Sequence, residues 1–162
     1  MFTKPVRDTL RSASLSEPDH PIREANTMPL KILLVDDNLT YVTAVRHFLD
    51  RLPGAVVTGQ AGDGKTALSL VRESPPDVVL LDIAMPGMNG LELARALQQL
   101  SVPPRIIFLS MHDNQEYRAA AHDLGAGFVS KSDFVAQLMP ALNRMALSHE
   151  DPGDGPHPGE LL

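Results

Sequence analysis

The sequence predicts an α/β domain in which a doubly wound, five-stranded parallel sheet is flanked by helices on both faces. Two observations lead to this prediction. Short apolar runs alternate with segments whose apolar residues recur at helical spacing, and this alternation repeats five times along the chain. The runs are continuously apolar and their connections are short, which is typical of parallel strands buried on both faces between helices.

The first half of this domain is defined by apolar runs and by residues that stop a helix. LKILLV ends in front of two acids, and DVVLLD has the same apolar character. The helix after LKILLV stops at Pro53, and the next one begins with Asp63 as its N-cap and stops before Pro75. In order, we expect a strand at 30–35, a helix at 39–52, a strand at 55–61, a helix at 63–74 and a strand at 77–82.

The second half continues the same alternation. GLELARALQQL carries leucines on one helical face, RIIFLS has the character of a buried strand, and Gly125 closes the helix that follows. A short strand and a last helix complete the domain, and we expect Ser132 to cap that helix. In order, we expect a helix at 90–100, a strand at 105–110, a helix at 114–125, a strand at 126–130 and a helix at 133–147.

The two ends of the chain lack this periodicity. Residues 1–28 mix prolines, serines and alternating charges, and residues 148–162 are rich in proline, glycine and acids. We therefore predict a mobile N-terminal arm at 1–28, a single folded domain at 29–147 and a disordered acidic tail at 148–162.

The composition excludes several classes of protein. The chain has no cysteine, so disulfides, thiolate zinc sites and cysteine catalysis are ruled out. No apolar run approaches the ~20 residues of a membrane span, and no signal peptide is visible, so we expect a cytoplasmic protein. The net charge of −6 argues against direct binding of nucleic acid, whose phosphates need a basic surface.

Three acids follow strand ends at one expected edge of the sheet. Asp36 and Asp37 come directly after the first strand, and Asp82 ends the third. Ligands of doubly wound folds bind outside the carboxyl ends of the strands, where these acids should converge. One acid alone could simply cap a helix or a turn, but three together repel one another. A hard divalent cation such as Mg²⁺, Mn²⁺ or Ca²⁺ would relieve that repulsion.

Two more polar residues end strands at the same edge. Lys131 can pair with Asp82 and later with a phosphoryl oxygen; the alternative is a solvated lysine at a helix start. Ser110 can donate its hydroxyl to an oxyanion on Asp82, although a serine after a strand is usually a cap or turn residue. Together with a metal ion, these groups meet the needs of phosphoryl transfer to an ionised Asp82 as the covalent nucleophile.

Four segments, KILLVDDN, VVLLDIAMPGMNG, IIFLSMH and GFVSKSD, follow one another in this order. Together they resemble the receiver domain of bacterial two-component response regulators, over roughly residues 29–146. The stretch LSMHDNQEYRAAAHDLGAGFVSKSD resembles the subtype usually joined to a helix-turn-helix DNA-binding domain. The resemblance implies the flavodoxin-like receiver fold and a signalling switch that uses Mg²⁺.

The resemblance also assigns a role to each acid at the sheet edge. It implies that Asp82 is the phosphoacceptor. It implies that Mg²⁺ is held by Asp37, Asp82 and the backbone carbonyl of Ala84. Asp36 would help to hold the ion.

The switch residues follow from the same resemblance. Ser110 matches the hydroxyl residue that moves toward the phosphoryl group, Lys131 matches the invariant lysine, and Phe128 occupies the aromatic switch position. Two departures from the family pattern stand out. Ser132 replaces the proline that often follows the lysine, and Phe128 replaces the commoner tyrosine. A plain core role for Phe128 therefore stays open.

These expectations describe a signalling switch. A phosphoryl group would pass to Asp82 from a sensor histidine kinase or a phosphotransfer protein. The surface built by residues 113–147 would then change and alter the binding of a downstream protein target, and a dimer is compatible with this role. We expect no enzyme acting on other substrates, although the domain would catalyse its own phosphorylation and slow dephosphorylation.

Three alternatives stay open from the sequence. A haloacid-dehalogenase-like phosphatase also uses a strand-end Asp with Mg²⁺, but it would want a second Asp where this chain has Ala84. A receiver-shaped interaction module could act without phosphorylation, although such modules usually lose some of the residues above. The chain could also be the receiver fragment of a DNA-binding transcription regulator.

Overall fold

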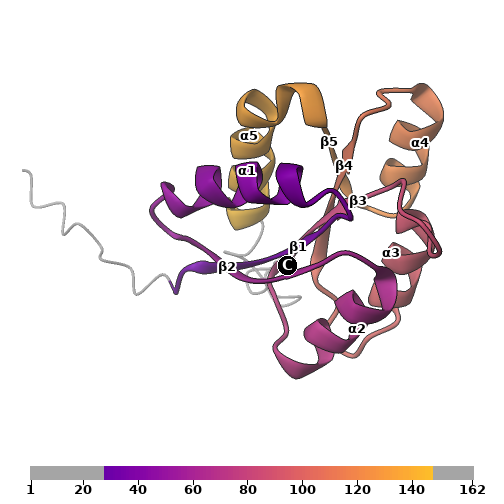
Figure 1. The fold of residues 1–162 in the computed structure, drawn as a ribbon, viewed down its shortest axis with the longest axis horizontal. Helices are drawn as coiled ribbons and strands as arrows, with labels where there is room; N and C mark the ends of the chain where they lie inside the picture. The colour runs from indigo at the N-terminus through magenta and orange to yellow at the C-terminus, as the bar shows by residue number, and fades with distance from the viewer. Residues whose placement is uncertain (1–27, 148–162) are drawn as a thin grey trace, which may run out of the picture.

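The structure, a computed structural model, describes residues 28–147, which form a parallel sheet covered by helices (Figure 1). The strands are β1 (Leu30–Val35), β2 (Ala55–Ala61), β3 (Val78–Asp82), β4 (Arg105–Ser110) and β5 (Gly127–Ser130). The helices are α1 (Leu39–Asp50), α2 (Gly64–Glu73), α3 (Gly90–Gln98), α4 (Gln115–Asp123) and α5 (Phe134–Leu147), and a short 3-10 helix, η1 (Lys131–Asp133), precedes α5.

The order of the strands fixes where a ligand can bind. They lie in the order β2-β1-β3-β4-β5, and all neighbours are parallel. The chain runs outward from β1 to β2 on one side and from β3 to β5 on the other, so the order reverses between β1 and β3. This reversal is the place where doubly wound sheets bind their ligands, at the carboxyl ends of the strands. The predicted fold class is confirmed.

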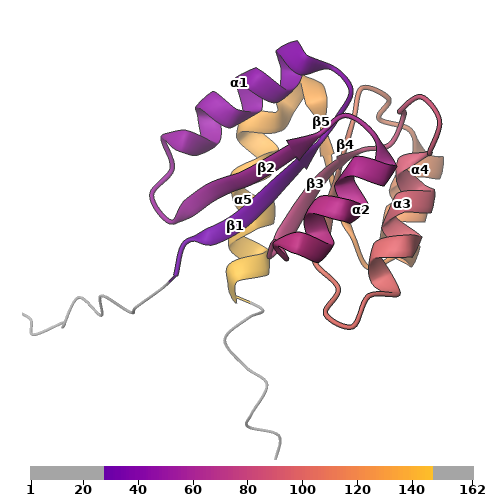
Figure 2. The same ribbon diagram turned by 60° about the horizontal axis from the view of Figure 1, so that its bottom comes forward.

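Two apolar clusters hold the helices against the sheet. Ile32 and Leu34 pack on the face covered by α1 and α5, whereas Leu33 and Val35 pack on the face covered by α2, α3 and α4. Figure 2 shows this division, with α1 and α5 on one side of the strands. Every residue of β3 is buried, which explains why the sequence of this strand is continuously apolar.

The predicted residues at the helix ends agree with the structure, except for Ser132. Asp63 caps α2 by accepting the Thr66 N–H at 2.7 Å, and Gly125 follows α4 with a φ of +66°. The prediction that Ser132 caps the last helix is wrong. The chain turns directly from β5 into η1, so Ser132 already lies inside a helical turn, and its hydroxyl oxygen is 2.9 Å from that of Ser130.

Both predicted terminal segments lie outside the described residues, apart from Met28. Met28 is exposed and immediately precedes the segment that leads into β1. Among the helices of residues 28–147, none combines the length and the apolar character that crossing a membrane requires.

Candidate functional site

Three carboxylates gather at the carboxyl ends of β1 and β3. Asp36, Asp37 and Asp82 each offer one oxygen, and these oxygens all lie within 4.8 Å of one another. Asp36 and Asp82 are buried, whereas Asp37 is exposed. The structure thus brings together the acids that the strand-end pattern singled out, with one of them facing solvent.

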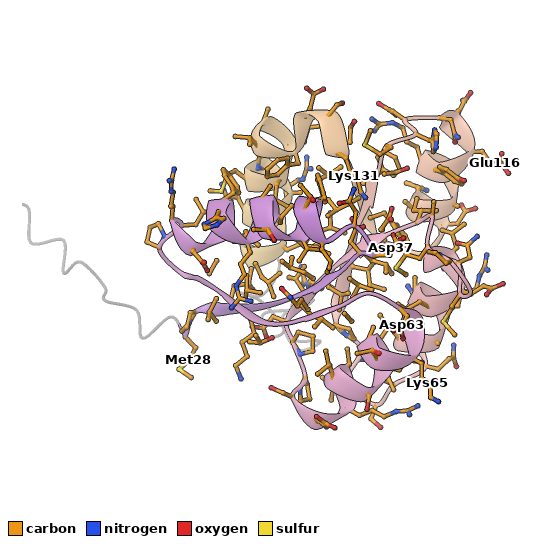
Figure 3. All side chains as sticks on the ribbon, viewed as in Figure 1. Met28, Asp37, Asp63, Lys65, Glu116 and Lys131 are labelled. Carbon is orange, nitrogen blue, oxygen red and sulfur yellow. The ribbon has the colours of Figure 1, made fainter. Side chains whose placement is uncertain are left out.

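Lys131 reaches into this group from the start of η1, directly after β5. Figure 3 labels Lys131 and Asp37, which come from opposite ends of the domain sequence. The Lys131 Nζ lies 2.5 Å from Asp36 Oδ2 and 3.4 Å from Asp82 Oδ2. Its side chain is 6% exposed, so the alternative of a solvated lysine is wrong. Asp36 is the nearer partner, a pairing that the sequence did not indicate.

The charges at this edge of the sheet are unbalanced. Two buried acids share one buried ammonium group, and the exposed Asp37 adds a further negative charge. Burial and the charge of Asp36 raise the pKa of Asp82 from 3.8 to about 6, although Lys131 and the Ala84 N–H act in the opposite direction. The oxygen ligands and the excess negative charge fit a hard divalent cation. The exposed Asp37 gives such an ion a route from solvent.

Ser110 ends β4 and is buried, but its hydroxyl forms hydrogen bonds with the backbone of the loop that follows. The Oγ donates to the His112 carbonyl at 3.1 Å and accepts the His112 N–H at 3.0 Å. An oxyanion on Asp82 would have to compete with these bonds. His112 itself is exposed, as expected for a loop residue.

Phe128 is half-buried in β5 and lies under a charged side chain. The guanidinium carbon of Arg118, in α4, is 4.7 Å from the centre of the Phe128 ring. Arg118 also donates two hydrogen bonds to Asp113, at 2.5 and 2.7 Å, and these bonds lower the pKa of Asp113. This arrangement was not predictable from the sequence, because Asp113 and Arg118 are not at the spacing of facing residues within one helix.

A glycine shapes the loop after Asp82. Gly90 begins α3, and its N–H donates to the Ile83 carbonyl at 2.8 Å. A side-chain carbon at Gly90 would collide with the Asp82 carbonyl, so no other residue allows this approach without a shift of the backbone. The loop therefore stays close to the Asp82 backbone, and the Ala84 N–H lies 3.4 Å from Asp82 Oδ1.

Tyr41 is a neighbour of the site that the sequence analysis missed. Its ring lies 4.6 Å from the Lys131 Nζ, and its hydroxyl is buried with no hydrogen-bond partner within residues 28–147. Burial, with the charges of Asp36 and Asp82, raises the pKa of Tyr41 well above its ordinary value. The sequence feature that could have predicted this contact is the position of Tyr41, about one helical turn after the two acids.

Comparisons with known proteins agree with this geometry. The family model of the response regulator receiver domain matches residues 32–143. The nitrate/nitrite response regulator protein NarL of Escherichia coli K12 is 35% identical over 123 residues, which are 75% of this chain and 57% of NarL. A protein-glutamate methylesterase/protein-glutamine glutaminase of Desulfotalea psychrophila is 38% identical over 74% of this chain and 33% of its own length.

A solved structure gives the same result. The signal receiver domain of the putative response regulator NarL from Mycobacterium tuberculosis is 32% identical and superposes with a TM-score of 0.68, over 74% of this chain and 97% of that one. The chain spans roughly a third to three fifths of the length of its curated relatives. This chain therefore matches one domain of each of these curated relatives and not their whole length.

Proposed function

This chain belongs to the response regulator receiver family, which works by phosphorylation-dependent switching, and from that premise we propose that Asp82 accepts the phosphoryl group. One observation carries the proposal. Asp82 is the buried carboxylate that ends the central strand β3, beside both the Lys131 ammonium and the other two acids. With a pKa of about 6, it is ionised at neutral pH, as a nucleophile must be.

The chemistry is transfer from a phosphohistidine of a sensor histidine kinase or phosphotransfer protein. An oxygen of Asp82 forms a bond to phosphorus, the phosphorus–nitrogen bond breaks, and its electron pair stays on the histidine. Lys131 lies where it can neutralise charge on a phosphoryl oxygen. The transfer also depends on in-line positioning of the phosphohistidine and the Asp82 oxygen.

The acids would hold Mg²⁺. Asp36 is already paired with Lys131 at 2.5 Å, so direct ligation falls to Asp37, Asp82 and the Ala84 carbonyl, with Asp36 supporting them. The ion, when bound, supplies positive charge to the transferring phosphoryl oxygens. Asp37 and Asp82 are the side chains on which its affinity depends.

The response to phosphorylation starts at Ser110. New charge on Asp82 attracts the Ser110 hydroxyl, which must then leave His112 and free the loop after β4. That loop includes Asp113, which holds Arg118 over Phe128, so its movement would uncover the Phe128 ring. The surface of α4, β5 and α5 changes as a result.

The output is a change in protein binding. Receiver domains of response regulators are generally not enzymes, and the methylesterase activity named for one relative belongs to a protein of which this chain covers 33%. We infer a cytoplasmic receiver domain at 29–147 that catalyses only its own phosphorylation and slow dephosphorylation and acts on a downstream protein. A role as the receiver part of a DNA-binding regulator is the second candidate, because the chain covers 57% of NarL.

The proposal is tested with a small phosphodonor. Wild-type protein is incubated with acetyl phosphate and Mg²⁺, and its intact mass is measured before and after mild base treatment. We expect the mass of one phosphoryl group to be added and then lost in base. Asp82→Asn should show no gain, whereas Asp113→Asn, the same substitution at an exposed acid, should behave as wild type. No gain in the wild type, or a gain that survives Asp82→Asn, overturns the proposal.

A further inference from the structure

We propose that Tyr41 is a positioning residue: its aromatic face fixes the Lys131 ammonium beside Asp82 and so sets the rate at which Asp82 is phosphorylated. The inference rests on the proposed function of Asp82 and adds to it a residue in the first turn of α1. Its basis is a contact, since the Lys131 Nζ lies over the Tyr41 ring at 4.6 Å from the ring centre.

Lys131 needs such a contact because its two acids pull it unequally. Its Nζ is 2.5 Å from Asp36 but 3.4 Å from Asp82, so the nearer acid draws the ammonium away from the reacting one. The flexible lysine stem does not resist this pull. Burial of the side chain also limits the access of water to the ammonium. The Tyr41 ring supplies the third side, and a buried cation is attracted strongly to an aromatic face.

The Tyr41 ring is itself held from two directions. The Tyr41 N–H donates to the side chain of Asn38 at 3.1 Å, and the Asn38 N–H donates to Asp36 Oδ1 at 2.9 Å. The helix cap therefore ties the backbone of Tyr41 to the acid that pairs with Lys131. From the other side, the ring meets Phe134 of α5 edge-on, with centres 5.7 Å apart, and Phe134 meets Phe48 in the same way at 5.5 Å.

The ring face, and not the hydroxyl, makes the contact. The Tyr41 hydroxyl is buried and has no hydrogen-bond partner among the described residues. Removing it leaves no partner unsatisfied, so phenylalanine at this position should keep the function. This separates the role of the ring from the role of its polar tip.

Three variants test the inference by their rates of phosphorylation with acetyl phosphate at fixed Mg²⁺. Tyr41→Leu should lower the second-order rate constant by about 3- to 30-fold, the range that a cation–aromatic contact supports. Tyr41→Phe should leave the rate unchanged. Phe48→Leu is the matched control, because it removes a ring from the same aromatic stack without touching Lys131. Equal rates for the two leucine variants, or a Tyr41→Phe as slow as Tyr41→Leu, overturn the inference.

A second readout does not depend on phosphorylation, and its decisive observation is made on the wild type. In the wild type, the ring current of Tyr41 should shift the NMR signals of the Lys131 ε-methylene protons upfield. The shift should persist in Tyr41→Phe and in Phe48→Leu and vanish in Tyr41→Leu. A wild type without this shift overturns the placement of Lys131. A wild type that shows the shift but takes up no phosphoryl group overturns the proposed function and leaves the placement intact.

Discussion

Two groups of residues in this domain make the same kinds of contact in opposite surroundings. The buried cluster consists of Asp36, Asp82, Lys131 and Tyr41, and the surface cluster of Asp113, Arg118 and Phe128. Each has an ion pair at 2.5 Å and a cation 4.6 or 4.7 Å from a ring centre. The paired side chains are 6% and 3% exposed in the buried cluster, but 47% and 46% exposed in the surface cluster.

The two clusters differ in their balance of charge and in the direction in which the pKa of the acid is shifted. In the buried cluster, two acids share one cation, and burial raises the pKa of Asp82. In the surface cluster, one acid meets one cation, and hydrogen bonds from Arg118 lower the pKa of Asp113. Similar contacts therefore accompany a buried carboxylate with a raised pKa in one place and an exposed, screened ion pair in the other. In the surface cluster, the paired Arg118 guanidinium lies over the Phe128 ring.

Removing the cation should produce the largest difference in stability between the two clusters. Lys131→Met leaves two buried acids without a partner and should lower the free energy of unfolding by about 3–5 kcal/mol. Arg118→Met removes an exposed cation and should cost much less. Urea unfolding at neutral pH without Mg²⁺ measures both. Similar losses for the two variants would contradict the comparison.

Mg²⁺ should stabilise the protein through the acids of the site and leave the surface cluster unaffected. At a concentration of about 100 times its Kd, the ion should add about 3 kcal/mol to the free energy of unfolding. Thermal melting with and without Mg²⁺ measures this gain. Asp37→Asn should reduce the gain strongly, whereas Asp113→Asn should leave it as in the wild type. An undiminished gain in Asp37→Asn would exclude this carboxylate as a ligand.

Neutralising Asp82 should stabilise the metal-free protein. Because the pKa of Asp82 is about 6 in the folded state and 3.8 ordinarily, the folded state takes up a proton first as the pH falls. The cost of its charge is therefore present above about pH 6 and disappears toward pH 4. Asp82→Asn should raise the free energy of unfolding by about 1–3 kcal/mol at pH 7. The gain should shrink as the pH falls, and urea unfolding that shows a pH-independent gain would contradict the account.

Neutralising the acid of the surface cluster should change the free energy of unfolding in the opposite direction from Asp82→Asn, and by the smallest amount. The pKa of Asp113 is lowered, so its pairing stabilises the fold at neutral pH and is lost as the pH falls through its folded value. Asp113→Asn should therefore be slightly destabilising at pH 7, and the difference from the wild type should fade in acid. A concentration of about 1 M NaCl should erase it too, since salt screens exposed pairs. A stability difference between Asp113→Asn and the wild type that persists in salt would show that the pair is not an exposed, screened one.

The sheet and the location of the site were predictable from the sequence for a physical reason. Strands buried on both faces must be continuously apolar, so their ends are visible in the sequence, as in β3. Parallel strands present all their carboxyl ends at one edge, so residues such as Asp36, Asp82 and Lys131 had to converge.

The contacts within the site were not predictable in the same way. The nearer pairing of Lys131 with Asp36, and the ring of Tyr41, depend on how α1 and η1 pack against the sheet. The bonds of Ser110 to His112 depend on the path of one loop, and the failure of Ser132 as a cap depends on a 3-10 turn. Distances of this kind are set by packing, which no spacing rule records.

Asp82, at the carboxyl end of β3 and 3.4 Å from the Lys131 ammonium, is the proposed phosphoacceptor. The most direct measurement is reduction of the phosphorylated protein with borohydride, which converts an aspartyl phosphate to homoserine, followed by peptide mass spectrometry. The assignment of Asp82 predicts homoserine at Asp82 alone, and none at Asp36, Asp37 or Asp113. Homoserine at any of those positions, or none in the peptide that contains Asp82, would contradict it.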